Sequence, residues 1–317
     1  MESYKNKGVF IHIIEYEKRG TLWRLLSGLN VYSNHKLLES RNKKIDLQKL
    51  GTNNHFIIHT SGRSFPIINS LEEFLQEGVI CSVFVHNSPD YILEKGCYEF
   101  IKKLRCLQSR FKFKVIVPSN AVKEAFLDFG IFCWVIRLGI SPIVLREPTR
   151  NLKKLEGRII TVNTNAQEKY IRAKGVDRFC EMIKHFGLED SAAILGVDLI
   201  SNDGIIRVKL THDEMLWILS KAKLYVQLSR SESYNITAIE ARQLKVPLLL
   251  SNTGGHKSCN LNSMFLVDTN SDLYNKYNNL INGDESTLNS LIDDNYKWSL
   301  ENENIESFKN CIEETCS

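Results

Sequence analysis

Residues 223–251, KLYVQLSRSESYNITAIEARQLKVPLLLS, have the clearest alternation of apolar and polar stretches in the chain. A short apolar run, 223–228, is followed by a small polar loop, an amphipathic stretch at 236–243 and a second apolar run at 246–250. Apolar runs that flank a segment of helical periodicity are typical of parallel strands joined by a helix. The segment therefore predicts a strand–helix–strand unit in a sheet covered by helices.

The same alternation continues in both directions from this segment. The further strands that we expect are 8–14, 55–59, 79–85, 113–117, 133–136, 158–162 and 192–197. The helices that we expect between them are 21–31, 98–110, 121–128, 176–186 and 211–221. This order predicts an α/β fold with two Rossmann-like, doubly wound parallel-sheet domains in tandem that face a cleft.

A charged, proline-containing stretch without apolar periodicity, 147–157, is expected to link the two domains. The first domain then comprises residues 1–146 and the second comprises 158–300. The polar end of the chain, 301–317, is expected to contain a helix. A length of 317 residues accommodates two domains of about 150 residues each.

The composition excludes several classes of protein. No apolar run approaches the roughly 20 residues that span a bilayer, and the N-terminal apolar stretch meets Glu15, so it reads as a strand rather than a signal peptide. The eight cysteines have neither a CxxC pair nor a zinc-ligand spacing, and no Asp-x-Asp triplet occurs. We therefore expect reduced thiols, no metal and a cytoplasmic location.

The charge is unevenly distributed. Residues 1–150 carry 22 Lys and Arg against 14 Asp and Glu, a net +8, whereas the remainder carries 19 against 23, a net −4. The basic half predicts an anionic partner, and six of its cations lie in the segment 100–114. Either this segment is a packed helix with a solvated face, or it binds an anionic membrane surface and makes the protein peripheral. No nucleic-acid motif accompanies these cations, so we expect no nucleic-acid partner.

Two carboxylates mark the segment 223–251 as a candidate binding site. Glu232 is expected in the loop and Glu240 about two turns along the helix, with seven residues between them. Free amides at a helix N-terminus favour a bound phosphate, and carboxylates accept hydrogen bonds from sugar hydroxyls. The plainer alternative is a capped helix with ordinary exposed glutamates.

Residues 229–255 resemble the donor-binding signature of the GT-B glycosyltransferases of family 4, in which two glutamates are separated by seven residues. Three further stretches, 115–123, 135–142 and 174–177, are similar to segments of that family and follow in the family's order. The resemblance is good from about residue 113 to residue 257. It implies a GT-B fold and the transfer of a sugar from a nucleotide-sugar with retention at the anomeric carbon.

The resemblance also implies a role for each matched residue. Glu240 would hold the ribose of the donor, and Glu232 would bind hydroxyls of the transferred sugar. Lys174 matches the family's diphosphate-binding lysine, and the alternative is a solvated surface lysine beside a turn glycine. The backbone amides expected near the sugar and the pyrophosphate are those of Tyr234, Asn235 and Ile236.

The chain departs from the family pattern in three places. Asn163-Thr164-Asn165 stands where the family has an arginine, and we expect Arg172 to supply the second cation instead. The family's glycine-rich first loop is reduced to Arg19-Gly20-Thr21. Ser233 and Asn235 replace glycines that are frequent in the signature.

His86 follows the expected strand 79–85, at the end of the sheet where ligands bind. It loosely matches a family histidine near the acceptor and the sugar, and the alternative is a loop histidine bonded to the backbone. His256, after two glycines, either faces the nucleotide or is a turn residue. The histidines that we expect to be structural are His12, His55, His59 and His185.

These features together predict a retaining, metal-independent glycosyltransferase, with His86, Lys174 and Glu232 as catalytic residues and no cofactor besides the donor, such as a UDP- or GDP-sugar. The acceptor is expected to be a glycan, a lipid-linked glycan or a protein, in surface-glycan synthesis of the bacterial type. The resemblance further implies that the helix within 301–317 packs back on the first domain. The alternatives are a catalytically silent GT-B subunit that supports a partner enzyme, and a module that binds nucleic acid or lipid through the basic half.

Overall fold

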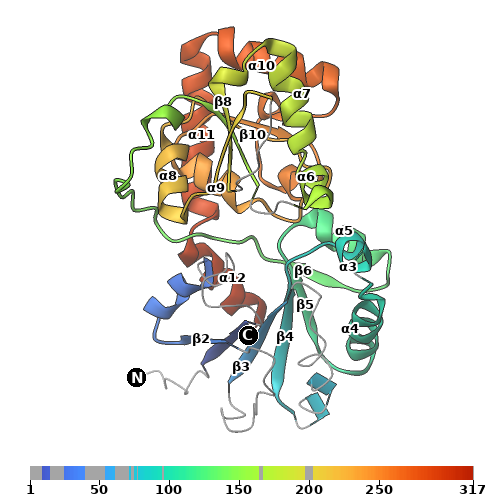
Figure 1. Ribbon diagram of the computed structural model, residues 1–317. Helices are drawn as coiled ribbons and strands as arrows, with labels where there is room; N and C mark the ends of the chain where they lie inside the picture. The colour runs from blue at the N-terminus through green and yellow to red at the C-terminus, as the bar shows by residue number, and fades with distance from the viewer. Residues whose placement is uncertain are drawn as a thin grey trace. The chain divides into compact units, whose positions relative to one another are not determined.

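A computed structural model describes residues 9–14, 25–39, 54–60, 71–72, 75–76, 78–94, 96–163, 167–196 and 203–316. The chain forms two compact units, an N-terminal unit of residues 1–141 and 304–317 and a C-terminal unit of residues 142–303. Each unit is built on one six-stranded sheet (Figure 1). The departures from the family pattern expected at residues 19–21 and 164–165 lie outside the described residues.

The sheet of the N-terminal unit has the strand order β2-β1-β3-β4-β5-β6, and all its pairs are parallel. The strands are β1 (Phe10–Ile14), β2 (His35–Glu39), β3 (His55–Thr60), β4 (Ile80–Val85), β5 (Lys114–Val117) and β6 (Cys133–Val135). The helices are α3 (Pro89–Glu94), α4 (Tyr98–Arg110), α5 (Asn120–Leu127) and α12 (Ile305–Cys316), with a 3-10 turn η1 (Gly28–Val31). Helices α4 and α5 pack on one face through Phe100, Leu104 and Phe126.

The opposite face of this sheet carries α12. Phe308 packs against Phe84, with 6.0 Å between the ring centroids, and the helix also buries Ile305 and Ile312. Gly139 admits this arrangement, because a Cβ there would lie only 2.0 Å from the carbonyl oxygen of Asn304. The end of the chain therefore belongs to the N-terminal unit, although the residues just before it belong to the other unit.

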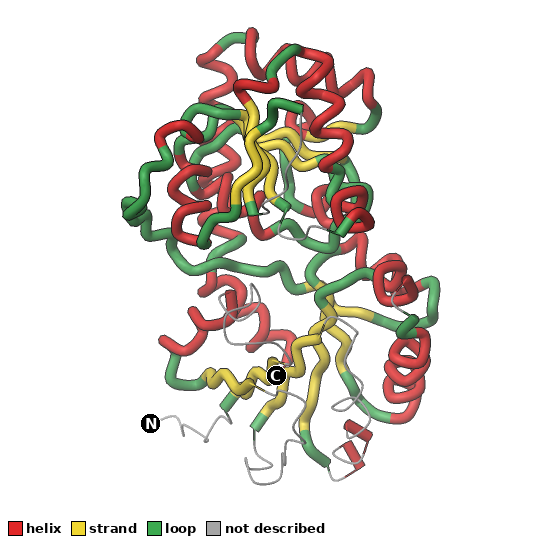
Figure 2. Tube along the Cα trace, in the orientation of Figure 1, coloured by secondary structure: helices red, strands yellow, loops and turns green. Residues whose placement is uncertain are grey.

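The sheet of the C-terminal unit has the order β12-β11-β10-β7-β8-β9, again entirely parallel. Its strands are β7 (Ile159–Val162), β8 (Ala192–Leu195), β9 (Ile206–Val208), β10 (Leu224–Gln227), β11 (Leu248–Ser251) and β12 (Leu266–Val267). Its helices are α6 (Glu168–Ala173), α7 (Val176–Phe186), α8 (His212–Ser220), α9 (Ile236–Gln243), α10 (Asn270–Asn282) and α11 (Glu285–Asn302). Short 3-10 turns are η3 (Lys153–Leu155), η4 (Glu189–Ser191), η5 (Gly254–Ser258) and η6 (Ser263–Phe265). Figure 2 shows strands between helices in this unit, as a doubly wound sheet requires.

Several boundaries differ from those expected. The units divide at residues 141 and 303 rather than at 146 and 300. The expected linker 147–157 is not a free connection, because Leu152 and Leu155 are buried in the core of the C-terminal unit. A few apolar residues in an otherwise charged stretch were enough to anchor it there.

Some elements were missed altogether. Strand β12 has only two residues, and strands β2 and β9 each have only two apolar residues, so the apolar pattern of all three is weak. The expected helix 21–31 is helical only at 25–27 among the described residues and then tightens into η1. The Asn-rich stretch from residue 270 forms α10 and α11, and α10 buries Leu273, Tyr277 and Leu280 against the core.

Candidate donor-binding site

The loop between β10 and α9 holds most of the candidate residues. Strand β10 ends at Gln227 and α9 begins at Ile236, which matches the expected helix. Asn235 caps the helix, since its side-chain Oδ1 accepts a hydrogen bond of 3.1 Å from the backbone N–H of Ala238. The first turn of α9 follows directly on the loop that contains Glu232, and the partial positive charge of the helix N-terminus stabilises an anion there.

Glu232 and Lys174 form an ion pair inside this loop. The Lys174 ammonium lies 2.6 Å from Oε2 of Glu232, and the Ser229 hydroxyl lies 3.4 Å from the same oxygen. Burial alone would raise the pKa of Glu232, which is 9% exposed, but the Lys174 charge and its hydrogen bond hold that pKa below the ordinary value. The site therefore contains an ionised carboxylate and a partly exposed cation, not an ordinary exposed glutamate.

Three glycines let the backbone approach this loop closely. A Cβ at Gly175 would lie 1.9 Å from the carbonyl oxygen of Leu228, and a Cβ at Gly254 would lie 1.9 Å from that of Glu232. A Cβ at Gly255 would lie 2.2 Å from the carbonyl oxygen of Ser233. Gly175 and Gly254 also have positive φ angles of 67° and 49°. Only glycine satisfies both conditions, so these residues fix the path of the loop.

His256 connects the α9 cap to the end of β11 through two hydrogen bonds. Its Nδ1 lies 2.8 Å from the carbonyl oxygen of Ser251 and donates to it, which leaves Nε2 to accept from the Asn235 side chain at 3.0 Å. The ring is fully buried, and burial lowers its pKa, so it is neutral. Of the two alternatives for His256, a residue facing the nucleotide or a turn residue, the structure supports the second, with a structural bond to the α9 cap.

Glu240 lies within α9 and is buried. Its Oε1 lies 3.2 Å from Nε2 of His212, the first residue of α8, and its exposed fraction is 5%. The sequence did not single out His212. The signal was present in Thr211, whose capping box with Glu214 starts α8 at that residue.

The remaining candidates of the C-terminal unit contribute in different ways. The Tyr234 hydroxyl donates to Oε1 of Glu303, at 3.0 Å, and the Tyr234 side chain is buried. Ile236 is the first residue of α9.

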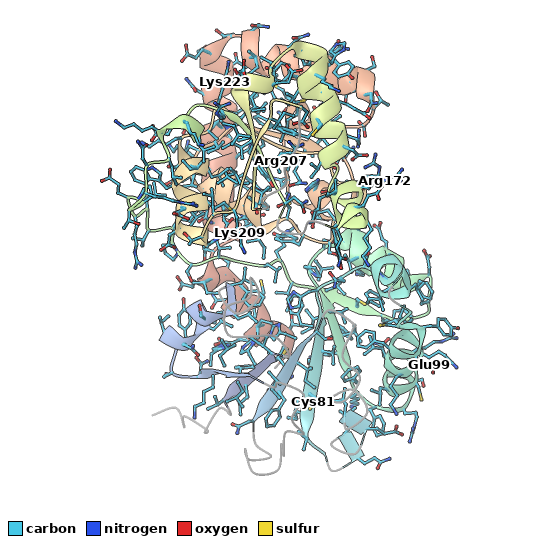
Figure 3. The ribbon with its side chains drawn as sticks, viewed as in Figure 1. Cys81, Glu99, Arg172, Arg207, Lys209 and Lys223 are labelled. Carbon is cyan, nitrogen blue, oxygen red and sulfur yellow. The ribbon has the colours of Figure 1, made fainter. Side chains whose placement is uncertain are left out.

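Arg172 is exposed on α6 (Figure 3), and its carbonyl oxygen accepts a hydrogen bond of 2.5 Å from Arg230. Arg230 in turn makes two bonds of 2.7 Å to Asp177, which ties α7 to the loop.

His86 belongs to the N-terminal unit, whereas all the other candidates belong to the C-terminal unit. Its ring stacks on Phe84 with 4.5 Å between centroids, and its Nε2 lies 3.0 Å from Nδ1 of His59. Burial lowers its pKa to about 3. The backbone N–H of His86 donates to the carbonyl oxygen of Thr60, at 2.9 Å. The ring of His86, however, bonds to the ring of His59. Neither the acceptor-side role nor the loop histidine bonded to the backbone had included this bond.

The basic segment 100–114 forms α4 and the approach to β5. The apolar stripe is buried as its spacing indicated, at Phe100, Ile101, Leu104 and Leu107. Lys103 and Arg110 both pair with Glu72, and Lys102 lies 3.4 Å from Glu99, which is labelled in Figure 3. Lys114 donates to the carbonyl of Thr315. Several of the six cations therefore already have protein partners.

No group of three or more His, Cys, Asp and Glu side chains within the described residues is placed to hold a metal ion. No helix in the same residues is long and apolar enough to cross a membrane.

Comparison with known proteins gives a likeness of structure rather than of sequence. No family model and no curated protein matches the chain. A UDP-forming α,α-trehalose-phosphate synthase from Burkholderia xenovorans is similar with a TM-score of 0.69 and 12% identity, covering 98% of both chains. The structure of such a synthase from the same organism with glucose-6-phosphate has a TM-score of 0.71 and 10% identity, covering 97% of this chain and 99% of that one.

A third similar structure is HepE from Anabaena in complex with UDP and glucose, with a TM-score of 0.64 and 13% identity, covering 97% of this chain and 99% of that one. The likeness extends over nearly the whole chain and so includes both of its parallel six-stranded sheets. The chain therefore has the GT-B fold, built from two Rossmann-like units.

Proposed function

We propose that the chain is a retaining glycosyltransferase that takes a sugar from a nucleotide-sugar. The observation that carries this proposal is the Lys174–Glu232 pair beside the N-terminus of α9. An ammonium group beside a helix N-terminus suits a diphosphate leaving group, because both stabilise the negative charge that develops on it. No protein nucleophile is required, since the donor phosphate takes the acceptor proton in front-face attack, as the resemblance to family 4 implies.

The two glutamates fit different parts of the donor. Glu232 is ionised, held by Lys174 and placed in the loop, so it suits hydrogen bonds from hydroxyls of the transferred sugar. Glu240 lies eight positions further along and pairs with His212, and we assign it to the ribose hydroxyls. The similar structures include a UDP-forming synthase, a synthase with glucose-6-phosphate and a complex with UDP and glucose, and this favours a UDP-sugar as the donor.

We assign the acceptor side to the N-terminal unit, with His86 as its catalytic residue. A sugar hydroxyl, whether on a free glycan, a lipid-linked glycan or a glycosylated protein, is the acceptor chemistry that a neutral imidazole suits, because its unprotonated nitrogen accepts the hydroxyl hydrogen. The proposed role in the cell is the synthesis of a surface glycan. Metal ions have no assigned part, because Lys174 and the α9 amides neutralise the diphosphate in this proposal.

The rival function is a catalytically silent subunit, which the replaced glycines at Ser233 and Asn235 would suit. Asn235 weakens that case, because it caps α9 and is itself held by His256. Two measurements distinguish the active enzyme from the silent subunit. The first is the melting temperature with a panel of nucleoside diphosphates and nucleotide-sugars, and the second is the release of nucleoside diphosphate from the nucleotide-sugars. A ligand at 100 times its Kd stabilises the protein by about 2.7 kcal/mol. A stabilising ligand that is also turned over supports the enzyme, and the absence of any shift contradicts the donor site.

Glu240→Ala is expected to weaken the binding of the stabilising nucleoside diphosphate by about 10- to 100-fold, because hydrogen bonds to a charged group contribute roughly 1.5–3 kcal/mol. Calorimetric titration measures the change. Glu181→Ala is the matched control, since Glu181 is an exposed glutamate of α7 in the same unit. Equal affinities in the two variants would show that Glu240 does not contact the ribose.

We also propose that the exposed cations of α4 and its C-terminal extension hold the protein at an anionic membrane surface. The cations available for this are Lys102, Arg105 and Lys112, which are exposed. Each contributes about 1 kcal/mol near an anionic surface and is screened by salt. Because Lys103 and Arg110 already pair with Glu72, binding is expected to be weaker than the sequence count of six cations indicated.

Cosedimentation with vesicles of anionic or neutral lipid tests this surface. Wild-type protein is expected to bind anionic vesicles at low salt, to dissociate at high salt and to ignore neutral vesicles. Changing the three exposed cations to Gln is expected to abolish binding. The matched control changes three exposed lysines of the C-terminal unit to Gln, namely Lys153, Lys154 and Lys221. Equal losses in both variants would assign the effect to net charge alone.

A further inference from the structure

Five side chains on the α12 face of the N-terminal sheet form an unbroken row of hydrogen bonds. They come in turn from α12, β2, β1, β3 and the end of β4, and they are Glu313, His35, His12, His59 and His86. The ring nitrogens of successive histidines lie 2.9, 2.9 and 3.0 Å apart, and His35 Nε2 lies 3.0 Å from Oε1 of Glu313. The row crosses four neighbouring strands and ends at His86, the residue proposed to bind the sugar acceptor.

The strand register produces this row. His35 pairs with Phe10, which is two residues before His12, and His59 pairs with Ile14, which is two residues after it. His86 likewise follows by two residues the partner of His59 on β4. Residues two apart on a strand face the same side, so all four rings lie on one face in a diagonal line toward the carboxyl ends of the strands.

The connecting atoms repeat in the same order throughout the row. In each step Nε2 of one ring meets Nδ1 of the ring nearer to Glu313, and the first ring, His35, meets the carboxylate through its Nε2. A neutral imidazole has one N–H and one acceptor nitrogen. If His35 donates at Nε2, its Nδ1 must accept from His12, and the same choice is forced on every ring that follows.

Glu313 sets this direction because it is ionised. Burial would raise its pKa, but hydrogen bonds from Asn34, His35 and Lys309 keep the pKa below the ordinary value. An ionised carboxylate only accepts hydrogen bonds, so His35 must donate to it. The row is therefore directed from a charged end on α12 to the neutral ring of His86.

The rings themselves are uncharged near neutral pH. His12 and His59 are 0% exposed, and burial, together with the neighbouring histidines, lowers the pKa of both. The charged and titratable groups that face the row from other elements are Glu313 and Lys309 on α12 and His55 on β3, with Lys114 on β5 acting through His55. Lys309 disfavours a positive charge on His35, and Lys114 disfavours one on His55.

We propose that Glu313, His35, His12 and His59 are positioning residues that hold His86 as its Nε2–H tautomer. The Nδ1 atom of His86 is then an obligate acceptor at the carboxyl end of β4, and it receives a hydrogen bond from a sugar hydroxyl. The identity of that hydroxyl group rests on the proposed function, whereas the tautomer follows from the N-terminal unit alone.

Nitrogen NMR of the full chain with 15N-labelled histidine rings tests the tautomer. The expected spectrum at neutral pH shows the four rings of the row protonated at Nε2, with 15N–15N couplings across each of the three N–H···N bonds. His256 is an internal reference of the opposite kind, since it donates from Nδ1 to the Ser251 carbonyl. A His86 ring protonated at Nδ1, or a row without couplings, overturns the proposal even if sugar transfer is demonstrated.

Glu313→Ala tests the origin of the direction, with Glu314→Ala, the exposed neighbour on α12, as the matched control. Loss of the charged acceptor is expected to reduce the ratio of Nε2–H to Nδ1–H at His86 by at least about tenfold, whereas the control leaves it unchanged. In a transfer assay the same variant is expected to lower kcat more than it changes donor KM. Identical spectra of the two variants overturn the proposal, and so does a folded variant whose His86 keeps the wild-type ratio.

Discussion

Lowering the pH from 7 to 5 is expected to reduce the free energy of unfolding of the N-terminal unit by at least about 4 kcal/mol, because His12 and His59 are held neutral by burial. In the unfolded chain each ring titrates near its ordinary pKa of about 6.5, so it gains a proton that the folded ring does not take up. Each contributes about 2 kcal/mol over this interval.

The sign follows from the direction of the pKa shift. A histidine whose pKa is lowered by folding gives stability that is complete above the unfolded pKa and is lost as the pH falls below it toward the folded pKa. His86, with a folded pKa of about 3, adds to the loss over the same interval. The window is therefore from about pH 6.5 downward.

Urea unfolding at pH 7 and pH 5, followed by pulse-labelling hydrogen exchange, reports on each unit separately. The C-terminal unit is an internal control, since among its described residues His256 is the buried histidine with a lowered pKa. His185→Gln replaces an exposed ring. It is expected to leave unchanged the difference in the free energy of unfolding between pH 7 and pH 5 in both units. An N-terminal unit that loses no more stability than the C-terminal unit would contradict the neutral histidine row.

Glu303→Ala is expected to destabilise the C-terminal unit by about 3–5 kcal/mol, because it leaves a buried arginine without its anion. Arg242 is 2% exposed and Glu303 is 0% exposed, with Nη1 of the arginine 3.1 Å from Oε2 of the glutamate. Within the part of the chain that the structure describes, Nε and Nη2 of Arg242 already lack a hydrogen-bond partner. The hydroxyls of Tyr234 and Ser299 also lose their acceptor, at 3.0 and 2.8 Å.

Urea denaturation measures the loss of stability in Glu303→Ala and compares it with the loss of an exposed ion pair. Asp293→Ala removes the partner of Lys245, where both side chains are about half exposed, at 48% and 51%. Such exposed pairs contribute about 1 kcal/mol or less. Glu303→Gln, which keeps the acceptor oxygen but not the charge, is expected to lie between the two. A Glu303→Ala protein as stable as the Asp293→Ala protein would show that the Arg242–Glu303 pair does not anchor α9.

The local elements could be predicted well where a cap and an apolar run coincide. The expected helices 236–243 and 176–186 have the bounds of α9 and α7, and the structure places Asn235 and Gly175 at their N-caps. The histidine row could not be predicted, because it depends on the register of β2 and β3, and β2 has only two apolar residues, Leu37 and Leu38, between polar ones. His12 and His59 were expected to be structural, but their connection to His86 was not foreseen.

The donor-site residues were found by resemblance, and their contacts were not. Lys174 and Glu232 stand 58 residues apart, and only the close approach allowed by Gly175 brings the loops together. Glu303 was missed because it lies in a polar stretch with no apolar spacing to indicate burial. A buried ion pair is a property of the packed unit, and no local pattern records it.

Release of nucleoside diphosphate from nucleotide-sugars, compared between wild type and Lys174→Gln, tests the proposed donor site most directly. Wild-type protein is expected to release the diphosphate from at least one UDP- or GDP-sugar. Lys174→Gln is expected to release it about 100- to 1,000-fold more slowly, as is typical when one group that stabilises developing charge is removed. Lys169→Gln, at an exposed lysine of α6, is expected to retain the wild-type rate. Equal rates for the wild type and a folded Lys174→Gln protein, or no release from any donor, would contradict the proposed donor site.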